Sequence, residues 1–564
     1  TSDVQHFAGE TVFNANKKIV ALIRENGSLL FSENYEHRYP HCWRCKNPVI
    51  FRATPQWFIS MDEGLGNKSL RGMALSEIQN VNWQPAWGED RMRNMLAGRP
   101  DWCVSRQRVW GVPIPVFYCT GCDDAVANAG VINHVADIFR QETADAWYER
   151  EAKDLLPEGY KCQQCGNTEF TKETDILDVW FDSGSSCVAV LETRENLRFP
   201  AEVYIEGGDQ YRGWFNSSLM VGLAAHDRAP YGTVLTHGWV VDGEGRKQSK
   251  SLGNVTPPEE IIKQSGAEIL RLWAAAVDYS EDMRCSQEIL QRVTDAYRKI
   301  RNTLRFALGN LDGFNPETDS VSTSNLLEID RWALGELDAV IEKVLGGYEE
   351  YNFQIVYHTL YNFATVTLSS RYFDIIKDRL YTAAPNSEAR RSAQTVLYRI
   401  ADVCARLVAP VLAFTADEIW ENLPNQIDPS VYLAEFPSVS CARDEKLAAR
   451  WEKLFPVRDE VLKSLEEARA AKLIGSSLEA KVILAVTSET LDLLRTYADD
   501  LRFIFIVSQV ELTEGEALSI KVEKAEGEKC ERCWNYSLLV GANVRYPAAC
   551  ERCAEALTEI EAGN

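Results

Sequence analysis

The sequence predicts a chain of several domains in which an α/β part precedes an all-α part and a small cysteine-rich part. A length of 564 residues corresponds to roughly four domains of about 150 residues. Short β-type runs ending at glycine-rich turns indicate the α/β part between residues 174 and 254. After about residue 285, apolar residues recur every three or four positions, as in amphipathic helices.

Composition and charge exclude several classes of protein. The chain is 45% hydrophobic and 25% charged, which is typical of globular domains and excludes wholesale disorder. With 60 Lys+Arg against 83 Asp+Glu, the net charge of −23 argues against a protein that coats nucleic acid. Because no apolar run reaches 18 residues, we expect no membrane span. The start lacks both a signal peptide and an initiator Met, so we expect a fragment or a processed product.

The α/β part is read from short segments in chain order. Residues 16–23 predict a helix, and residues 38–115 alternate short apolar runs with turns rich in Trp and Pro. Residues 119–165 predict an insertion bounded by two cysteine knuckles. Residues 203–205 and 233–235 predict strands that end at polar, glycine-rich segments, and ligands of open α/β sheets bind outside such strand ends.

The all-α part begins with one long amphipathic helix over residues 289–311, whose polar positions carry arginines from Arg292 to Arg305. These arginines fit either a phosphate-binding face or ordinary solvated charge. Further helices predict a bundle, over residues 328–347, 352–380, 387–408 and 412–422. After a linker at 424–437, a helix at 445–474 and strands at 481–486 and 503–512 predict a small α/β part.

Cysteine spacing predicts structural zinc in a reducing cytoplasm. Ten of the 15 cysteines form five Cys-x-x-Cys pairs, a spacing that lets both thiolates reach one tetrahedral Zn²⁺. Sixteen residues separate the two pairs of the C-terminal set, Cys530, Cys533, Cys550 and Cys553. A second set joins pairs 39 residues apart, Cys119, Cys122, Cys162 and Cys165. The pair Cys42 and Cys45 has no spare partner pair, so it either shares zinc with a segment outside this chain or is metal-free.

A glycine- and serine-flanked loop at residues 243–254 carries Lys247 and Lys250. Lysines on a mobile loop suit a polyphosphate, because they can stabilise the charge that develops on leaving pyrophosphate. A solvated basic turn is the alternative interpretation.

Polar residues follow the first predicted strand. Glu206, Asp209 and Gln210 lie among glycines and aromatics, where they could meet a ligand amine or ribose hydroxyls. Trp180 and Trp214 fit either the wall of such a pocket or ordinary core packing.

Four motifs stand in a fixed order. They begin at Trp102 (Trp-Cys-Val-Ser-Arg-Gln-Arg-Val-Trp-Gly), Asp178 (Asp-Val-Trp-Phe-Asp-Ser-Gly), Glu206 (Glu-Gly-Gly-Asp-Gln-Tyr-Arg-Gly-Trp-Phe) and Lys247 (Lys-Gln-Ser-Lys-Ser). In this order they resemble the class I aminoacyl-tRNA synthetases, and within that class the bacterial isoleucyl-tRNA synthetases. The terminal cysteine module supports isoleucine over valine or leucine, and the resemblance covers essentially the whole chain.

The resemblance implies a multidomain fold. A partial Rossmann-type catalytic domain spans residues 38–285, with the cysteine-knuckle insertion at about 119–165. The other implied parts are the trailing edge of an editing domain (1–37), a helical-bundle anticodon-binding domain (286–440), a small α/β C-terminal junction (441–525) and a zinc-binding module (526–564).

The resemblance also implies the activity, which is ATP-dependent formation of isoleucyl-adenylate and transfer to tRNA(Ile). Lys247 and Lys250 would be catalytic, and Lys250 would contact ATP, with Mg²⁺ expected. The residues implied to bind isoleucyl-adenylate are Glu206, Gly207, Asp209, Gln210, Trp180 and Trp214. Arg532 and Arg552, inside the terminal knuckles, are candidate phosphate contacts for tRNA.

The sequence departs from this family in two places. None of its 7 histidines forms the family's His-x-Gly-His element, and most of the editing domain is missing, so we expect an inactive fragment, monomeric or paired with an N-terminal half. Gln248 replaces the usual Met of the lysine loop, which puts the anchoring of the loop in doubt. The alternatives are a valyl-tRNA synthetase and a non-catalytic tRNA-binding zinc protein.

Overall fold

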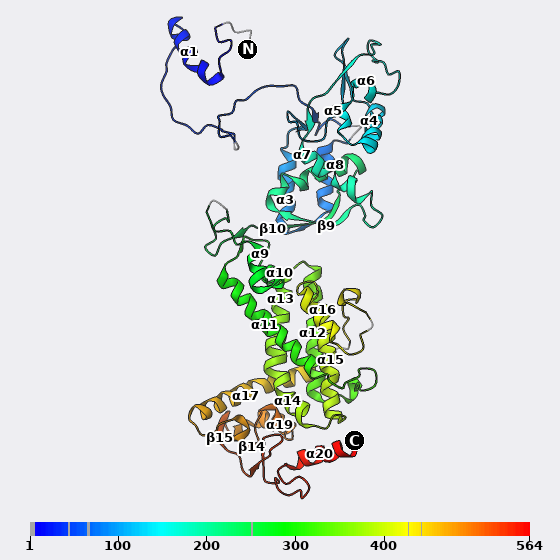
Figure 1. The fold of residues 1–564 in the computed structure, drawn as a ribbon. Coiled ribbons are helices and arrows are strands. Elements are labelled where there is room, and N and C mark those ends of the chain that lie inside the picture. The colour runs from blue at the N-terminus through cyan, green and yellow to red at the C-terminus, as the bar shows by residue number, and fades with distance from the viewer. Residues whose placement is uncertain are drawn as a thin grey trace. The chain divides into compact units, whose positions relative to one another are not determined.

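The structure is a computed structural model that describes residues 6–42, 45–64, 68–249, 252–426, 428–440 and 443–563 (Figure 1). The chain divides into two compact units. The first unit comprises residues 1–71 and 99–182, and the second comprises residues 72–98 and 183–564. Among the described residues, no helix is both long and apolar enough to cross a membrane.

The first unit begins with helix α1 (Val12–Glu25), which includes the helix predicted at 16–23. The Thr11 side chain accepts a hydrogen bond from the Asn14 N–H and so caps the helix N-terminus. Two short antiparallel strand pairs follow, β1 (Phe58–Ile59) with β3 (Trp102–Cys103), and β4 (Ser105–Arg106) with β8 (Ile176–Leu177).

The predicted insertion forms a subdomain with its own apolar core. Its sheet has the order β6-β5-β7 and is covered by three helices. These elements are β5 (Phe117–Cys119), β6 (Ala125–Val126), β7 (Phe170–Lys172), α4 (Ala129–Glu142), α5 (Ala146–Glu149) and α6 (Ala152–Leu155). Phe117 and Trp147 lie at its centre, with ring centroids 5.0 Å apart.

The second unit contains a parallel sheet of order β2-β10-β9. Both predicted strands are present and extend to β9 (Ala201–Gly207) and β10 (Tyr231–His237). The second unit also contains β2 (Asn82–Gln84), α3 (Trp87–Ala97), α8 (Trp214–His226), β11 (Val240–Val241) and β12 (Met283–Arg284), while α2 (Leu70–Glu77) and α7 (Val179–Gly184) each cross a boundary between the units.

The predicted helices of the all-α part are all present. They are α11 (Gln287–Gly309), α12 (Glu328–Glu349), α13 (Phe353–Asn362), α14 (Phe373–Thr382), α15 (Glu388–Val408) and α16 (Ala413–Glu421), preceded by α9 (Pro258–Ser265) and α10 (Ala267–Ala276). A π-helical segment, Phe363–Tyr372, joins α13 to α14. One continuous apolar core links these helices to the junction that follows.

The junction combines α17 (Glu445–Ala470) with a sheet of order β14-β13-β15. The prediction of a strand over 503–512 is wrong in its first half, because α19 (Leu501–Ile504) and a turn after it lie there, and β14 is Gln509–Glu514. A short continuous apolar run does not distinguish a buried helix from a strand. The remaining elements are β13 (Ala480–Val486), α18 (Ser488–Arg495) and β15 (Ser519–Lys524).

The C-terminal module has little regular structure. It consists of β16 (Glu528–Lys529), β17 (Tyr536–Ser537) and α20 (Glu551–Gly563). Its buried core is made of four cysteines and Ala549.

Candidate active site and metal centres

The carboxyl ends of β9 and β10 form the edge at which the predicted ligand-binding residues lie. In the parallel register, Glu206 pairs with Thr236, and Gly207 pairs with His237. The Glu206 side chain is exposed, and one of its carboxylate oxygens accepts a hydrogen bond from the Gly207 N–H at 3.1 Å. A solvent-facing carboxylate therefore stands at the strand end where open α/β sheets bind ligands.

The turn after β9 is tightly built. Gln210 accepts a hydrogen bond from the Trp214 N–H at 3.0 Å, which starts α8, and donates to Asp209 at 3.2 Å. A Cβ on Gly207 would lie 3.0 Å from Asp209 Oδ1, so a side chain there would force the carboxylate to move. The sequence of this turn thus brings Glu206, Gly207, Asp209 and Gln210 into one short segment at the sheet edge.

Trp214 is held firmly in the second unit. Its ring stacks on Tyr204 with centroids 4.1 Å apart and planes at 9°. Its indole N–H donates to the Ser183 carbonyl at 3.2 Å and to the Ser186 hydroxyl at 3.3 Å. Burial raises the pKa of Tyr204 to about 12, so this stacking partner stays a neutral phenol.

Trp180 belongs to the first unit, where its side chain is 40% exposed. Its backbone N–H donates to the Asp178 carboxylate at 3.2 Å at the start of α7. The exposure does not fit the core-packing alternative, and its place beside Trp214 stays a prediction.

Asp242 ties the lysine loop together. Its carboxylate accepts hydrogen bonds from the N–H groups of Glu244 and Arg246, from the Arg246 guanidinium and from the Asn254 amide. These donors, Asn254 first among them, hold the pKa of Asp242 well below its usual range. Asn254 also accepts from the Ser249 N–H at 3.0 Å, so both ends of the loop are fixed to one carboxylate. Spacing alone did not reveal this anchor.

Lys247 is exposed, and its ammonium lies 5.3 Å from the ring centroid of Trp239. Lys250 lies outside the described residues. Gln248 accepts a hydrogen bond from the Thr256 N–H at 3.4 Å, and its buried amide nitrogen has no hydrogen-bond partner in the described part of the chain. The loop is therefore anchored here by a polar contact where the family pattern has an apolar Met.

Sequence patterns missed Arg91, which places a cation at the same sheet edge. Its guanidinium lies 5.3 Å from the ring centroid of Tyr211 and 5.6 Å from that of Trp87. The Tyr211 hydroxyl is 2.9 Å from the hydroxyl of Thr236, the residue paired with Glu206. The only sequence signal for Arg91 was its position in α3, the helix that directly follows β2.

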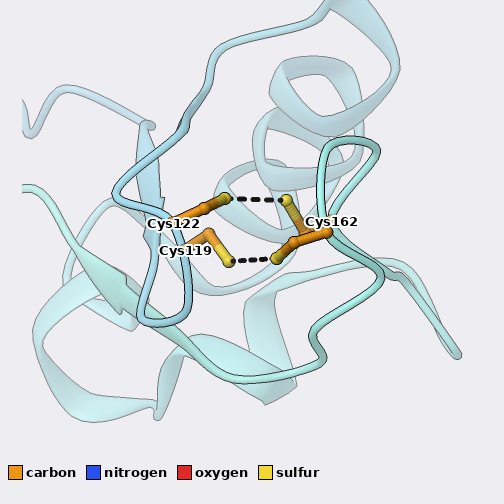
Figure 2. Close-up of side chains that lie close together, drawn as sticks. Cys119, Cys122 and Cys162 are labelled. Carbon is orange, nitrogen blue, oxygen red and sulfur yellow. Dashed lines mark hydrogen bonds between the residues drawn. The ribbon is translucent and has the colours of Figure 1, made fainter.

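The cysteines of the insertion converge as predicted. Sγ–Sγ distances are 3.5 Å between Cys119 and Cys165 and 3.6 Å between Cys122 and Cys162, and all four sulfurs lie within 4.8 Å of one another (Figure 2). Sulfurs about 2.3 Å from a tetrahedral Zn²⁺ lie roughly 3.8 Å apart. Four thiolates at these separations fit structural zinc, with no open position for catalysis.

The C-terminal cysteines also converge. Cys530, Cys533, Cys550 and Cys553 are all buried, and their sulfurs lie within 4.8 Å of one another. The Sγ atoms of Cys533 and Cys550 are 3.6 Å apart, and the Cys550 N–H donates to Cys530 Sγ at 3.3 Å. An amide that points at a ligand sulfur fits a thiolate cluster around zinc.

The turn that begins at Cys42 has the same backbone hydrogen bond as the other cysteine knuckles. Its N–H donates to the Asn47 carbonyl at 2.8 Å, as the Cys119, Cys162 and Cys530 N–H groups do to the residue five positions later. Lys46, directly after Cys45, has a φ of 60°. The described residues at the two ends of this turn therefore have the backbone of a zinc knuckle, although two thiolates supply only half of a tetrahedral set.

Comparison with known proteins decides the family. Residues 5–286 match the class I tRNA synthetases described as I, L, M and V. The chain belongs to this family. Residues 330–484 match the anticodon-binding domain of tRNA ligase, and residues 527–556 match the zinc finger found in FPG and IleRS. The resemblance inferred from the four motifs and the multidomain fold class are confirmed.

Three similar curated proteins are each named isoleucine–tRNA ligase. The Syntrophotalea carbinolica protein is 53% identical over 99% of this chain, which covers 61% of that protein. The Geobacter sulfurreducens protein is 51% identical over 98% of this chain and 61% of its own length. The Caldicellulosiruptor saccharolyticus protein is 51% identical over 98% of this chain and 60% of its own length. The chain thus spans about three fifths of these relatives.

In this synthetase chain, Arg532 and Arg552 of the zinc finger contact the helical bundle. Arg552 forms an ion pair with Asp378, with one hydrogen bond of 2.9 Å, and Arg532 donates to the Thr382 carbonyl. Both contacts reach the C-terminal half of α14 in the helical bundle. Contact of these two arginines with tRNA phosphates stays a prediction.

The arginine face of α11 is largely paired. Arg292 contacts Glu288, Arg298 contacts Asp295 at 3.4 Å, and Arg301 contacts Glu418 at 2.8 Å. Such pairing favours the solvated-charge interpretation of this face.

Proposed function

We propose that this chain is the larger part of an isoleucine–tRNA ligase, which activates isoleucine with ATP and transfers it to tRNA(Ile). The observation that carries the proposal is the edge of the parallel sheet, where Glu206 stands beside Gly207 and the lysine loop follows the neighbouring strand. The names of its relatives support isoleucine as the amino acid.

The reaction needs two displacements and no covalent bond to the protein. An oxygen of the isoleucine carboxylate attacks the α-phosphorus of ATP, the α–β phosphoanhydride bond breaks, and pyrophosphate leaves. A ribose hydroxyl at the tRNA 3′ end then attacks the carbonyl carbon of the adenylate. That hydroxyl loses its proton, the acyl–phosphate bond breaks, and AMP leaves.

Each site residue has a proposed part. Lys247 and Lys250 stabilise the charge that develops on pyrophosphate, and Mg²⁺ accompanies ATP. Glu206, Asp209 and Gln210 hold polar groups of isoleucyl-adenylate, and Gly207 allows its close approach. Anchoring by Asp242 keeps the lysine loop near its working geometry.

The amino-acid side chain would meet an apolar wall from Trp214, with Trp180 as the second wall. Trp214 suits this part because its ring orientation is fixed by two hydrogen bonds and by Tyr204. A single methylene contributes too little for such a pocket to exclude valine by binding alone.

The other parts of the chain have proposed roles in the same reaction. We assign residues 38–285 to catalysis, 286–440 to the tRNA anticodon, and 441–525 to the junction. Residues 526–564 hold structural zinc, and residues 1–37 belong to an editing domain. Four-thiolate sites hold loops in place and leave no position for chemistry.

A chimera tests the proposal. This chain replaces its matched 61% of the Syntrophotalea carbinolica ligase, and ATP–pyrophosphate exchange is measured with isoleucine, valine and leucine. We expect isoleucine-dependent exchange from the chimera and none from the chain by itself. Preference for valine would favour a valyl-tRNA synthetase. A folded chimera that binds tRNA(Ile) without exchange would favour the non-catalytic alternative.

A further inference from the structure

A cavity of about 420 Å³ lies in the second unit, remote in sequence from the proposed active-site residues. Its wall is built from the start of α12, from α14 and the residues that follow it as far as Ala389, from α17, from the segment Tyr497 to Ile504, and from α20. This volume lies within the range of small-molecule sites in proteins. Three parts of the chain, the bundle, the junction and the zinc finger, meet around it.

Much of the lining is apolar. Ile375, Ile376, Trp451 and Ile504 line the cavity, and each is at least nine-tenths buried. A rigid wall of aliphatic and aromatic groups favours an apolar ligand moiety, because covering it removes apolar surface from water.

The basic groups of the wall are already neutralised. Arg379 is paired with Asp330, which is fully buried, and Arg552 is paired with Asp378. Each guanidinium therefore has a carboxylate of its own. A phosphate or carboxylate ligand would have to displace one of these pairs.

The acidic groups are in excess. Asp500, Glu555 and Glu559 line the cavity as solvent-exposed residues, and within the described residues their carboxylates have no hydrogen bond or ion pair. The pKa of Asp500 is raised, first by partial desolvation and then by the charge of Asp499, against the opposing charges of Arg379 and Arg502. Carboxylates that lack an ion-pair partner next to an apolar wall are complementary to a cation that carries an apolar group.

We infer that this cavity binds a small amphipathic cation, with an aryl or alkyl group against Ile376 and Trp451 and an ammonium group at Asp500, Glu555 and Glu559. Three carboxylates in one rim attract a cation and repel polyanions such as nucleic acid. The site is distinct from the proposed adenylate site, since none of the residues assigned to isoleucyl-adenylate or to the lysine loop lines the cavity.

Three matched probes test the charge preference. They are 2-phenylethylamine, 2-phenylethanol and 3-phenylpropionate, which differ mainly in the polar end. Binding to the full chain is followed by calorimetry and by the shift in Tm. We expect saturable binding of the amine, at least tenfold weaker binding of the alcohol, and no binding of the acid. Equal binding of the amine and the acid would overturn the inference.

Two variants locate the site. The triple change Asp500→Asn, Glu555→Gln and Glu559→Gln should weaken amine binding at least tenfold, whereas Glu452→Gln, an exposed residue of α17 outside the lining, should not change it. Ala389→Leu adds volume inside the cavity and should reduce binding of both the amine and the alcohol. Circular dichroism establishes that each variant is folded. Unchanged binding in the folded triple variant, or in Ala389→Leu, would show that the probes bind elsewhere.

Discussion

The two four-cysteine clusters have the same donor atoms and different surroundings. In the insertion, Cys122 and Cys165 are exposed, and a separate apolar core centred on Phe117 and Trp147 lies beside the cluster. In the C-terminal module all four cysteines are buried, and together with Ala549 they are the core. Zinc therefore adds to an existing core in the first case and replaces a core in the second. Although the ligand sets are the same, we expect folding of the C-terminal module to depend on zinc more than folding of the insertion does.

The largest expected effect is loss of the C-terminal core. Cys550→Ser should release one zinc per chain and unfold residues 526–563, because structural zinc binding contributes on the order of 10 kcal/mol to such modules. Hydrogen exchange followed by mass spectrometry should show α20 unprotected. Cys187→Ser, a buried cysteine outside both clusters, is the control. If α20 kept its exchange protection after zinc loss, zinc would not replace a core in the C-terminal module, and the contrast with the insertion would be wrong.

The matching change in the insertion should have a smaller effect. Cys122→Ser should also release one zinc, but α4 and the core around Trp147 should keep their exchange protection, because burial of apolar surface is retained. The knuckle loops alone should become unprotected. Global unfolding of residues 117–172 would show that the apolar core is insufficient and that both clusters depend equally on metal.

A third change separates docking from folding in the C-terminal module. Arg552→Ala removes the ion pair to Asp378 and should weaken attachment of the module by about 2 kcal/mol, with zinc retained. A double-mutant cycle with Asp378→Asn measures the pair by itself. Additive effects of the two changes would mean that the contact does not hold the module.

The smallest expected effect concerns one backbone angle in the insertion knuckle. Gly166 has a φ of 77°, and Gly166→Ala should destabilise the insertion by about 1 kcal/mol because residues with a side chain disfavour this region. Asp123 and Trp534 hold the equivalent angle at 56° and 64° in the other knuckles. Chemical denaturation with zinc present gives the free energy of unfolding. A stabilised variant would mean that the turn is less constrained than the structure indicates.

Periodicity and spacing predicted much of this fold, and they failed for identifiable reasons. The bundle helices were predictable because each has one apolar stripe, and the cysteines because their spacing fixes their geometry. The secondary structure of residues 503–512 was not predictable, because a continuous apolar run has no period. Partners distant in sequence, such as Arg552 with Asp378, leave no local signal at all.

The site shows the same limit. The residues of one turn, Glu206 to Gln210, were predictable together because they are adjacent in sequence. Arg91 reaches the sheet edge through tertiary structure alone, and the Asp242 anchor depends on hydrogen bonds from both ends of a loop. Local pattern cannot show either feature.

The central claim is that the edge formed by β9 and β10 holds the isoleucyl-adenylate. The most direct test is the rate of isoleucine-dependent pyrophosphate exchange in the chimera after Glu206→Gln, a change that keeps the shape and removes the charge. We predict a fall of at least about 100-fold, on the scale of losing a charged contact to the transition state. An unchanged rate in a folded, zinc-loaded variant would contradict the account.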